Sequence, residues 1–199
     1  KYSPPSVRQT LEPILEVLAG IPTVVYGFFA LAAISPLLQD WLPWDVAIFN
    51  ALAAGIVMGV MIIPTVASLS EDAMAAVPRS LRDGAYALGS SRMIVSLRVV
   101  VPAALSGIVA AIVLAISRAI GETMIVLIAM GLRPTLTWNP LETGQTLASY
   151  IGFAGIGDQP TSSFDYTTLF AVGSLLFVIT FIMNMISIRL VRKYREVYE

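Results

Sequence analysis

An arginine and a glutamate stand four residues apart inside a long apolar segment of this sequence. Between Val99 and Leu132, Arg118 and Glu122 are the only charged residues. Residues four apart in an α-helix share one face, so these side chains are predicted to lie on one side of a single helix. A charge in the middle of an apolar segment usually marks an ion pair or a substrate pathway, because its burial in lipid is costly.

Two interpretations of this charged pair are open. In the first, Arg118 lies on an anion pathway, because its guanidinium group is planar, always charged and suited to oxyanions. In the second, Arg118 and Glu122 form a buried ion pair that fixes the position of the helix. Ser117 and Thr123 flank the pair. Their hydroxyl groups could serve a bound anion, or they could bond the backbone of their own helix.

The composition excludes several kinds of chemistry. There is no cysteine and no histidine, which removes thiol nucleophiles, disulfides and histidine-ligated metals, so no metal or other cofactor is expected. A membrane enzyme would need a serine–lysine pair, but the only lysines, Lys1 and Lys193, lie outside the apolar segments. The sequence also lacks the G-x-x-x-x-G-K-[ST] loop that holds nucleotide phosphates, and its net charge of -1 gives no indication of a nucleic-acid partner.

The same composition indicates an integral membrane protein built from helices. The chain has 199 residues, is 57% hydrophobic and 13% charged, and has a mean hydropathy of +0.81. Soluble proteins carry about 25% charged residues. A bilayer-spanning helix needs about 20 apolar residues. We predict one all-α transmembrane domain over residues 1–199, in membrane lipid, with four spans at about residues 14–38, 47–69, 103–131 and 167–188.

The basic residues predict the orientation of these spans. Ten of the twelve Lys and Arg residues lie before the first span, in the segment 70–102 or after the fourth span, whereas the segment 132–166 has only Arg133. Basic loops stay in the cytoplasm. We therefore expect a multi-pass protein of the cytoplasmic membrane with both ends of this chain in the cytoplasm. The outer segment 132–166 is either a docking surface or a simple connection.

The cytoplasmic segment 70–102 is predicted to contain a short amphipathic helix. Ser80 and Asp83 have the spacing of a capping box, and Gly89 is suited to end the helix. An apolar stripe is expected from Leu81, Ala85 and Leu88. Because so short a helix is marginal in water, it should form against its own bundle or against a partner protein.

Several motifs then resemble a known family. Asp83, Gly84 and Ala85, followed by Gly89 and Pro102, resemble the EAA loop of permeases of bacterial ABC importers, although Asp and Gly replace the first Glu and Ala. Four further stretches are similar to the phosphate-specific, Pst-type permeases, and nearer their PstC-like than their PstA-like subunit: LAGIPTVVYGFFAL, AVPRSLRDGAYALGSSR, LAISRAIGET and TLFAVGSLLFVITFIMN.

This resemblance implies a fold and a set of partners. It implies the MetI-like fold of type I importer permeases, usually with six spans, so that two N-terminal helices are expected outside this chain. It implies a second permease subunit, a cytoplasmic ABC ATPase dimer that hydrolyses ATP, and an extracytoplasmic phosphate-binding protein. The residues implied to contact the ATPase are Leu81, Asp83, Gly84, Ala85, Leu88, Gly89 and Pro102.

The resemblance also implies a substrate. Phosphate would then contact Arg118. From the chemistry of the carboxylate, and not from the resemblance, we infer that Glu122 orients Arg118 or accepts the proton that hydrogen phosphate carries, which would discriminate against sulfate. Another oxyanion importer, for sulfate or molybdate, is the alternative within transport. A passive membrane anchor would explain the spans but not the charged pair or the loop helix.

Overall fold

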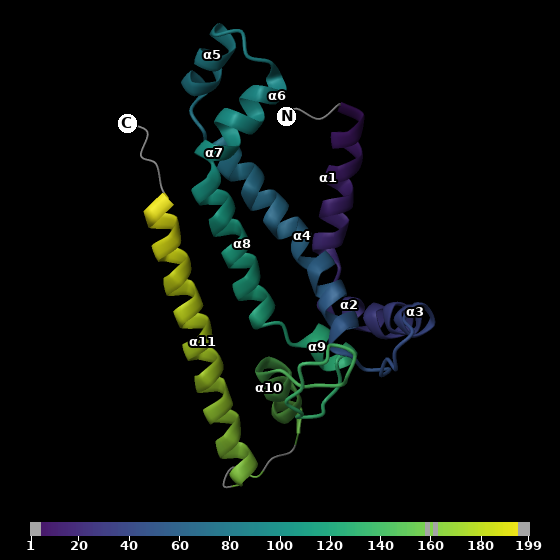
Figure 1. The fold of residues 1–199 in the computed structure, drawn as a ribbon. Coiled ribbons are helices and arrows are strands. Elements are labelled where there is room, and N and C mark those ends of the chain that lie inside the picture. The colour runs from purple at the N-terminus through teal and green to yellow at the C-terminus, as the bar shows by residue number, and fades with distance from the viewer. Residues whose placement is uncertain (1–4, 158–159, 161–162, 195–199) are drawn as a thin grey trace. The chain divides into compact units, whose positions relative to one another are not determined.

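The computed structural model describes residues 5–157, 160 and 163–194, and every regular element in these residues is a helix. The all-α fold class predicted from composition is therefore confirmed. The elements, labelled as in Figure 1, are α1 Pro5–Gly20, α2 Thr23–Phe29, the π-helix η1 Ala30–Ile34, α3 Ser35–Trp41, α4 Ala51–Ala75, α5 Arg79–Ala87, α6 Arg92–Val95, the π-helix η2 Ser96–Val100, α7 Val101–Ala103, α8 Leu105–Ile120, α9 Met124–Ala129, α10 Leu147–Ile156 and α11 Phe164–Tyr194.

Three helical segments among the described residues are long and apolar enough to cross a membrane, by length and composition. They are Thr23–Trp41, Ala51–Ala75 and Tyr166–Arg189. A fourth span arises if the pair Arg92–Ala103 and Leu105–Ile120, bent by 65°, is counted as one. The four predicted stretches overlap these four segments, but their boundaries differ, and helix breaks interrupt the first and the third predicted stretches.

Proline and glycine cause the first break. The predicted first span begins at about residue 14, but α1 ends at Gly20 and a new helix starts at Thr23, after Pro22. Proline lacks a backbone N–H and fixes its own φ, so a helix ends or restarts beside it. The second break lies inside the predicted third span, where α8 ends at Ile120 and α9 begins at Met124.

The chain forms two compact units. The first comprises residues 1–19, 63–116 and 183–199, and the second comprises residues 20–62 and 117–182, so α4, α8 and α11 each contribute to both. In the first unit, an apolar cluster gathers the α4–α5 linker, α6 and the segment around α7; its buried members are Val77, Val95, Val100 and Ala104.

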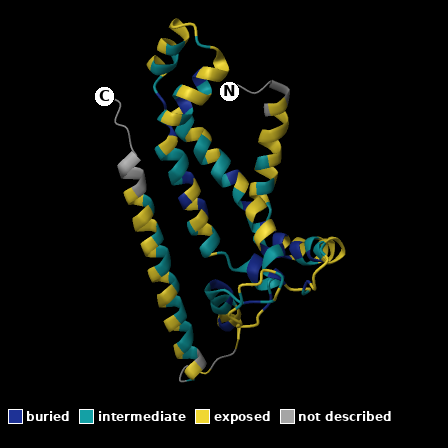
Figure 2. Cartoon of the chain, in the orientation of Figure 1, coloured by how far each residue is buried: buried dark blue, intermediate teal, exposed yellow. Residues whose placement is uncertain are grey.

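The second unit is built around α9, which packs against α2, η1 and α10. Ile125, Val126 and Ala129 of α9 are buried, as are Tyr26 of α2 and Ala30 of η1, and Figure 2 shows dark blue gathered on these elements. Small residues allow the close approach that this packing needs. A Cβ atom added to Gly27 of α2 would lie 3.0 Å from the Ile128 Cβ atom. Thus α9, although it has only six residues, is held on several sides.

Candidate functional site

Arg118 and Glu122 lie on either side of a break between two helices. Arg118 is an exposed residue in the last turn of α8, while Glu122 is half-buried and precedes α9. The chain turns between them, where the Glu122 N–H donates to the Ala119 carbonyl oxygen at 3.1 Å. The prediction that the two charges share one face of a continuous helix is therefore wrong. The i, i+4 rule holds only within an unbroken helix, and α8 ends at Ile120, before Gly121.

The carboxylate of Glu122 caps the short helix α9. Its Oε1 atom accepts from the backbone N–H groups of Met124 at 3.1 Å and Ile125 at 3.4 Å. The first N–H groups of a helix have no partner within the helix, and a negative charge there is favourable. Glu122 therefore caps α9 at the break, a role that neither interpretation of the charged pair had included.

The hydroxyl groups that flank the charged pair differ in what the structure shows of them. The Thr123 hydroxyl donates to the Gly121 carbonyl oxygen at 3.3 Å, which is a bond to the backbone of the break between the helices. Ser117 is half-buried in α8, next to Arg118. Gly152 of α10 approaches Thr123 so closely that a Cβ atom added there would lie 2.5 Å from the Thr123 Cγ2 atom. Glu122 thus stabilises the break through its hydrogen bonds to the backbone that follows, and α10 packs against the same break.

An asparagine that sequence reasoning missed organises the other end of α9. Asn50 is fully buried, and its backbone N–H donates to the Ala129 carbonyl oxygen at 3.0 Å. Its Nδ2 atom donates to Ser35 Oγ at 3.1 Å and to the Ala47 carbonyl oxygen at 2.9 Å. Its Oδ1 atom accepts from the Ala53 N–H at 2.7 Å, which caps α4. An asparagine directly before an apolar run is a recognised helix-start signal and could have identified this residue.

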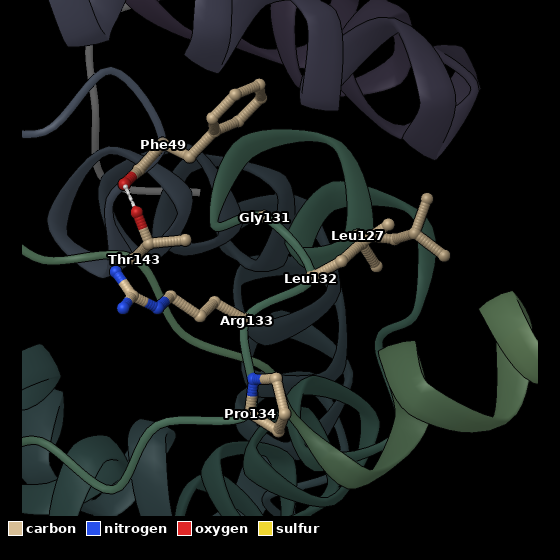
Figure 3. Close-up of a pocket in the computed structure, with 7 residues that line it drawn as sticks. All are labelled: Phe49, Leu127, Gly131, Leu132, Arg133, Pro134 and Thr143. Atoms are coloured by element: carbon tan, nitrogen blue, oxygen red, sulfur yellow. Dashed lines mark hydrogen bonds between the residues drawn. The ribbon is translucent and has the colours of Figure 1, made fainter.

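The segment 131–146 forms an ordered platform beside α4 rather than a loose loop. Backbone N–H groups of Ala47 and Leu52 donate to the carbonyl oxygens of Leu141 and Pro140, at 3.0 and 2.8 Å. At its start a pocket of about 500 Å³ opens, and the Thr143 hydroxyl closes one wall by donating to the Phe49 carbonyl oxygen at 2.9 Å (Figure 3). The pocket is lined by Phe49, Leu127, Gly131, Leu132, Arg133, Pro134 and Thr143.

The platform also carries a perturbed carboxyl group. Hydrogen bonds from the Thr137 and Asn139 side chains, together with the charge of Arg133, hold the pKa of Glu142 below its ordinary value. The Asn139 Nδ2 atom donates to Glu142 Oε1 at 2.9 Å. The one basic residue of the segment 132–166 therefore lies close to an acidic residue of the same segment.

The predicted amphipathic helix of the segment 70–102 is α5, with corrections at both ends. It begins at Arg79 after Pro78 and has no side-chain cap, so the capping box predicted at Ser80 is wrong. A capping residue must precede the helix, whereas Ser80 already lies inside it. Gly89 does follow the helix and has a positive φ of 78°, which confirms its predicted role as the stop.

The apolar stripe of α5 divides into an inner and an outer part. Leu81 and Ala85 pack against the apolar cluster of the first unit, so this face is bound by the chain itself. Leu88 is 88% exposed because it lies beyond the helix end at Ala87, so its predicted place in the stripe is wrong. Asp83 and Gly84 are exposed as well.

Two further residues define how this region joins its neighbours. Pro102 stands in the first turn of α7, just before the 65° bend that leads into α8. Arg82, which sequence reasoning did not single out, donates from Nη2 to the Met74 carbonyl oxygen of α4 at 2.5 Å. The predicted set thus contains inward-packed, exposed and bend-forming residues.

The chain is similar in sequence to a known family of transport proteins and to several of its members. Residues 1–196 match the family described as binding-protein-dependent transport system inner membrane component. The chain is 37% identical over 190 residues to a probable ABC transporter permease protein, YqgH, of Bacillus subtilis, covering 96% of this chain and 60% of that protein. It is 32% identical over 215 residues to the phosphate transport system permease protein PstC of Xylella fastidiosa, covering 97% and 65%.

Other relatives agree, and the chain spans about three fifths to two thirds of their length. A probable phosphate transport system permease protein PstC of Methanocaldococcus jannaschii is 30% identical over 213 residues, with 98% of this chain and 66% of that protein covered. The predicted resemblance to this group of permeases is confirmed.

A solved structure shows the fold. A chain of the MetNI methionine ABC transporter, in an inward-facing conformation, superposes with a TM-score of 0.74 at 18% identity, covering 96% of this chain and 76% of that chain. The MetI-like fold is thereby confirmed, and with it a multi-pass membrane protein. The chain belongs to the family of inner membrane components of binding-protein-dependent transport systems.

Proposed function

We propose that this chain is the permease subunit of an ATP-driven importer of inorganic phosphate. The observation that carries this proposal is the similarity along 97–98% of the chain to proteins named as phosphate transport system permeases. The chemistry of Arg118 supports it, because a guanidinium group matches the oxygens of phosphate and stays ionised at any working pH. Sulfate or molybdate import is the alternative.

Arg118 is the proposed phosphate contact on the transport pathway. It is exposed at the end of an interrupted helix, and membrane transporters commonly form their substrate sites at such interruptions. Glu122 supports this site indirectly in our proposal, because its carboxylate caps α9 and so fixes the break that follows Arg118. Ser117 and Thr123 remain candidate pathway residues on either side.

The proposed partners use different surfaces. An ABC ATPase dimer, which would hydrolyse the ATP, is proposed to contact the exposed residues Asp83, Gly84 and Leu88 of the α5 region. An extracytoplasmic phosphate-binding protein is proposed to dock on the platform, where Leu136 and Trp138 are 98% and 97% exposed. A second, related permease subunit would complete the pathway.

The proposed orientation places α5 in the cytoplasm and the platform outside. The chain has no cysteine, so single cysteines can be introduced without removing others. Ser80→Cys should react with a membrane-impermeant thiol reagent only from the cytoplasmic side, and Leu136→Cys only from outside. The opposite pattern would invert the orientation and remove the surfaces assigned to both partners.

Substrate identity is tested with the complete importer in proteoliposomes, with all subunits at full length. Phosphate should stimulate ATP hydrolysis and enter the vesicles, and excess sulfate or molybdate should not compete. Stimulation by sulfate or molybdate instead of phosphate would favour the alternative. If none of the three anions stimulates ATP hydrolysis, the proposal that this importer carries an oxyanion is excluded.

The role of Arg118 is tested by substitution. Arg118→Gln should lower phosphate uptake about tenfold or more, because a hydrogen bond to a charged group contributes about 1.5–3 kcal/mol. Arg118→Lys should also lower uptake because the bidentate fork is lost. Arg98→Gln, at an exposed arginine of η2, is the matched control and should leave uptake unchanged.

A double variant separates the pathway role from a structural ion pair. Glu122→Gln keeps an oxygen that can cap α9, so this variant should be mild. If the two residues are only a structural pair, Arg118→Gln combined with Glu122→Gln should restore both assembly and uptake. Assembly without uptake in the double variant is the result that the pathway proposal predicts.

A further inference from the structure

Arg82 joins α5 to the end of α4 by a hydrogen bond within the first unit. Its Nη2 atom donates to the Met74 carbonyl oxygen at 2.5 Å, and Met74 lies in the last turn of α4. The same carbonyl oxygen accepts from the Val77 N–H at 3.4 Å. A carbonyl oxygen has two lone pairs, so both donors can be accommodated.

Charge strengthens this contact. The last carbonyl oxygens of a helix lack partners within the helix and carry a partial negative charge. A positively charged donor at this position is therefore favoured, and hydrogen bonds from ionised donors are about twice as strong as those between neutral groups. Arg82 supplies such a donor from the next helix of the chain.

The surroundings of Arg82 show that the side chain is held in place. Its Nε atom is buried and, within the part of the chain that the structure describes, has no hydrogen-bond partner. A buried donor without an acceptor is costly, so a long side chain that was free to move would turn this group to solvent. Arg79, one turn earlier on α5, is exposed and lacks this confinement.

Two kinds of contact attach α5 to its neighbours. Leu81 and Ala85 pack against the apolar cluster of the first unit, on which Met74 of α4 and Ile108 of α8 also pack. Arg82 adds a hydrogen bond to α4. Apolar contacts are non-directional and allow sliding, whereas a hydrogen bond fixes direction and distance.

We infer that Arg82 is a positioning residue that makes α5 and the end of α4 move as one body during transport. Through this contact, movement imposed on α5 by the ATPase reaches α4 in addition to α8. The inference rests on the proposed function, since it assigns how the ATPase contact on α5 acts on the membrane helices.

Transport measurements on the complete importer test the consequence. Arg82→Met should assemble with its partners and keep basal ATP hydrolysis, but lose about tenfold in phosphate-stimulated hydrolysis and in uptake. Arg82→Lys should be intermediate, because an ammonium group can still donate to the Met74 carbonyl oxygen. The control Arg79→Met should change neither quantity. Normal stimulation in Arg82→Met would overturn the inference.

A distance measurement tests the mechanism without relying on phosphate or on the Met variant. Spin labels on Ser70→Cys in α4 and Ser80→Cys in α5 should keep one distance in the nucleotide-free and ATP-bound importer. In the Arg82→Lys background, where the ammonium group keeps only part of this contact, the distance should vary to a limited extent between these states. A distance that changes while Arg82 is present would overturn the inference. If phosphate fails to stimulate the unaltered importer while the distance stays constant, the substrate proposal fails and the inference about Arg82 stands.

Discussion

The Asn50 network and the α5 helix are held in opposite ways. Asn50 and Ser35 are almost completely buried, and each polar atom of the Asn50 side chain has a partner within the chain. By contrast, α5 has no fully buried residue, and Figure 2 shows much of it in the exposed colour. A buried, satisfied polar network specifies one geometry, whereas an exposed helix is free to bind a partner.

This difference explains why the two regions should respond differently to substitution. Changes at Asn50 remove partners from buried groups and should reduce stability. Changes on the outer face of α5 remove nothing from the interior and should alter coupling. Substitutions at Asn50, Gly107 and Gly89, and titration of Glu142, test this difference between the two regions.

Asn50→Leu should destabilise the protein by about 3 kcal/mol, because three side-chain hydrogen bonds are lost and buried groups remain unsatisfied. Thermal unfolding of the detergent-solubilised protein measures this change. The control Asn139→Leu, on the exposed platform, should cost less than about 1 kcal/mol. Equal losses of stability in both variants would mean that the buried Asn50 network stabilises the protein no more than the exposed Asn139 does.

Gly107→Ala should destabilise the first unit by about 1–3 kcal/mol, the usual cost of overpacking. A Cβ atom added to Gly107 of α8 would overlap the Ala73 Cβ atom of α4. Adding Ala73→Gly should restore much of the stability, as measured by the same unfolding experiment. Gly55→Ala is the control, since nothing lies within 4 Å there. An uncorrected loss in the double variant would contradict this close approach.

Gly89→Ala should cost about 1–2 kcal/mol locally, because a residue with a Cβ atom is strained at a φ of 78°. The open space around Gly89 means that the strain is in the backbone and not in packing. The expected readout is weaker ATPase stimulation with normal expression, since the turn after α5 is displaced. Gly59→Ala, inside α4 and also in open space, should be tolerated.

The lowered pKa of Glu142 predicts a small dependence of platform stability on pH. Its pKa lies below the ordinary value of 4.5, so the contacts from Thr137 and Asn139 stabilise the platform fully above pH 4.5 and are lost as pH falls through the lowered pKa. With Trp41 and Trp44 replaced by Phe, Trp138 fluorescence should report a transition below pH 4.5. Glu142→Gln should abolish it, and a midpoint at or above 4.5 would contradict the assignment.

Local sequence signals predicted the features that depend on a few neighbouring residues. Gly89 ends α5 as expected, and Leu81 and Ala85 form its apolar face. The capping box at Ser80 and the place of Leu88 were wrong by a shift of the helix boundaries. Pro78 determines the start of α5, and the helix ends before Leu88.

At the candidate site, local sequence signals were not sufficient to predict the structure. The types and spacing of Arg118 and Glu122 identified an unusual position, but spacing alone assumed an unbroken helix. At the break, α10 packs close to Thr123 and α2 packs against α9, and these contacts join residues distant in the sequence. The hydrogen bond from Arg82 to Met74 was missed because it forms only once α5 folds back on α4.

The sequence by itself determined the membrane class, the helical architecture and the family resemblance, because these follow from composition and from motifs of a few residues. Only the tertiary structure decided which polar groups meet. Asn50 reaches Ala129, Arg82 reaches Met74, and Glu122 caps α9 instead of sharing a helix face with Arg118. Hydrogen bonds need particular distances and directions, and an apolar pattern, which only separates buried from exposed positions, does not encode them.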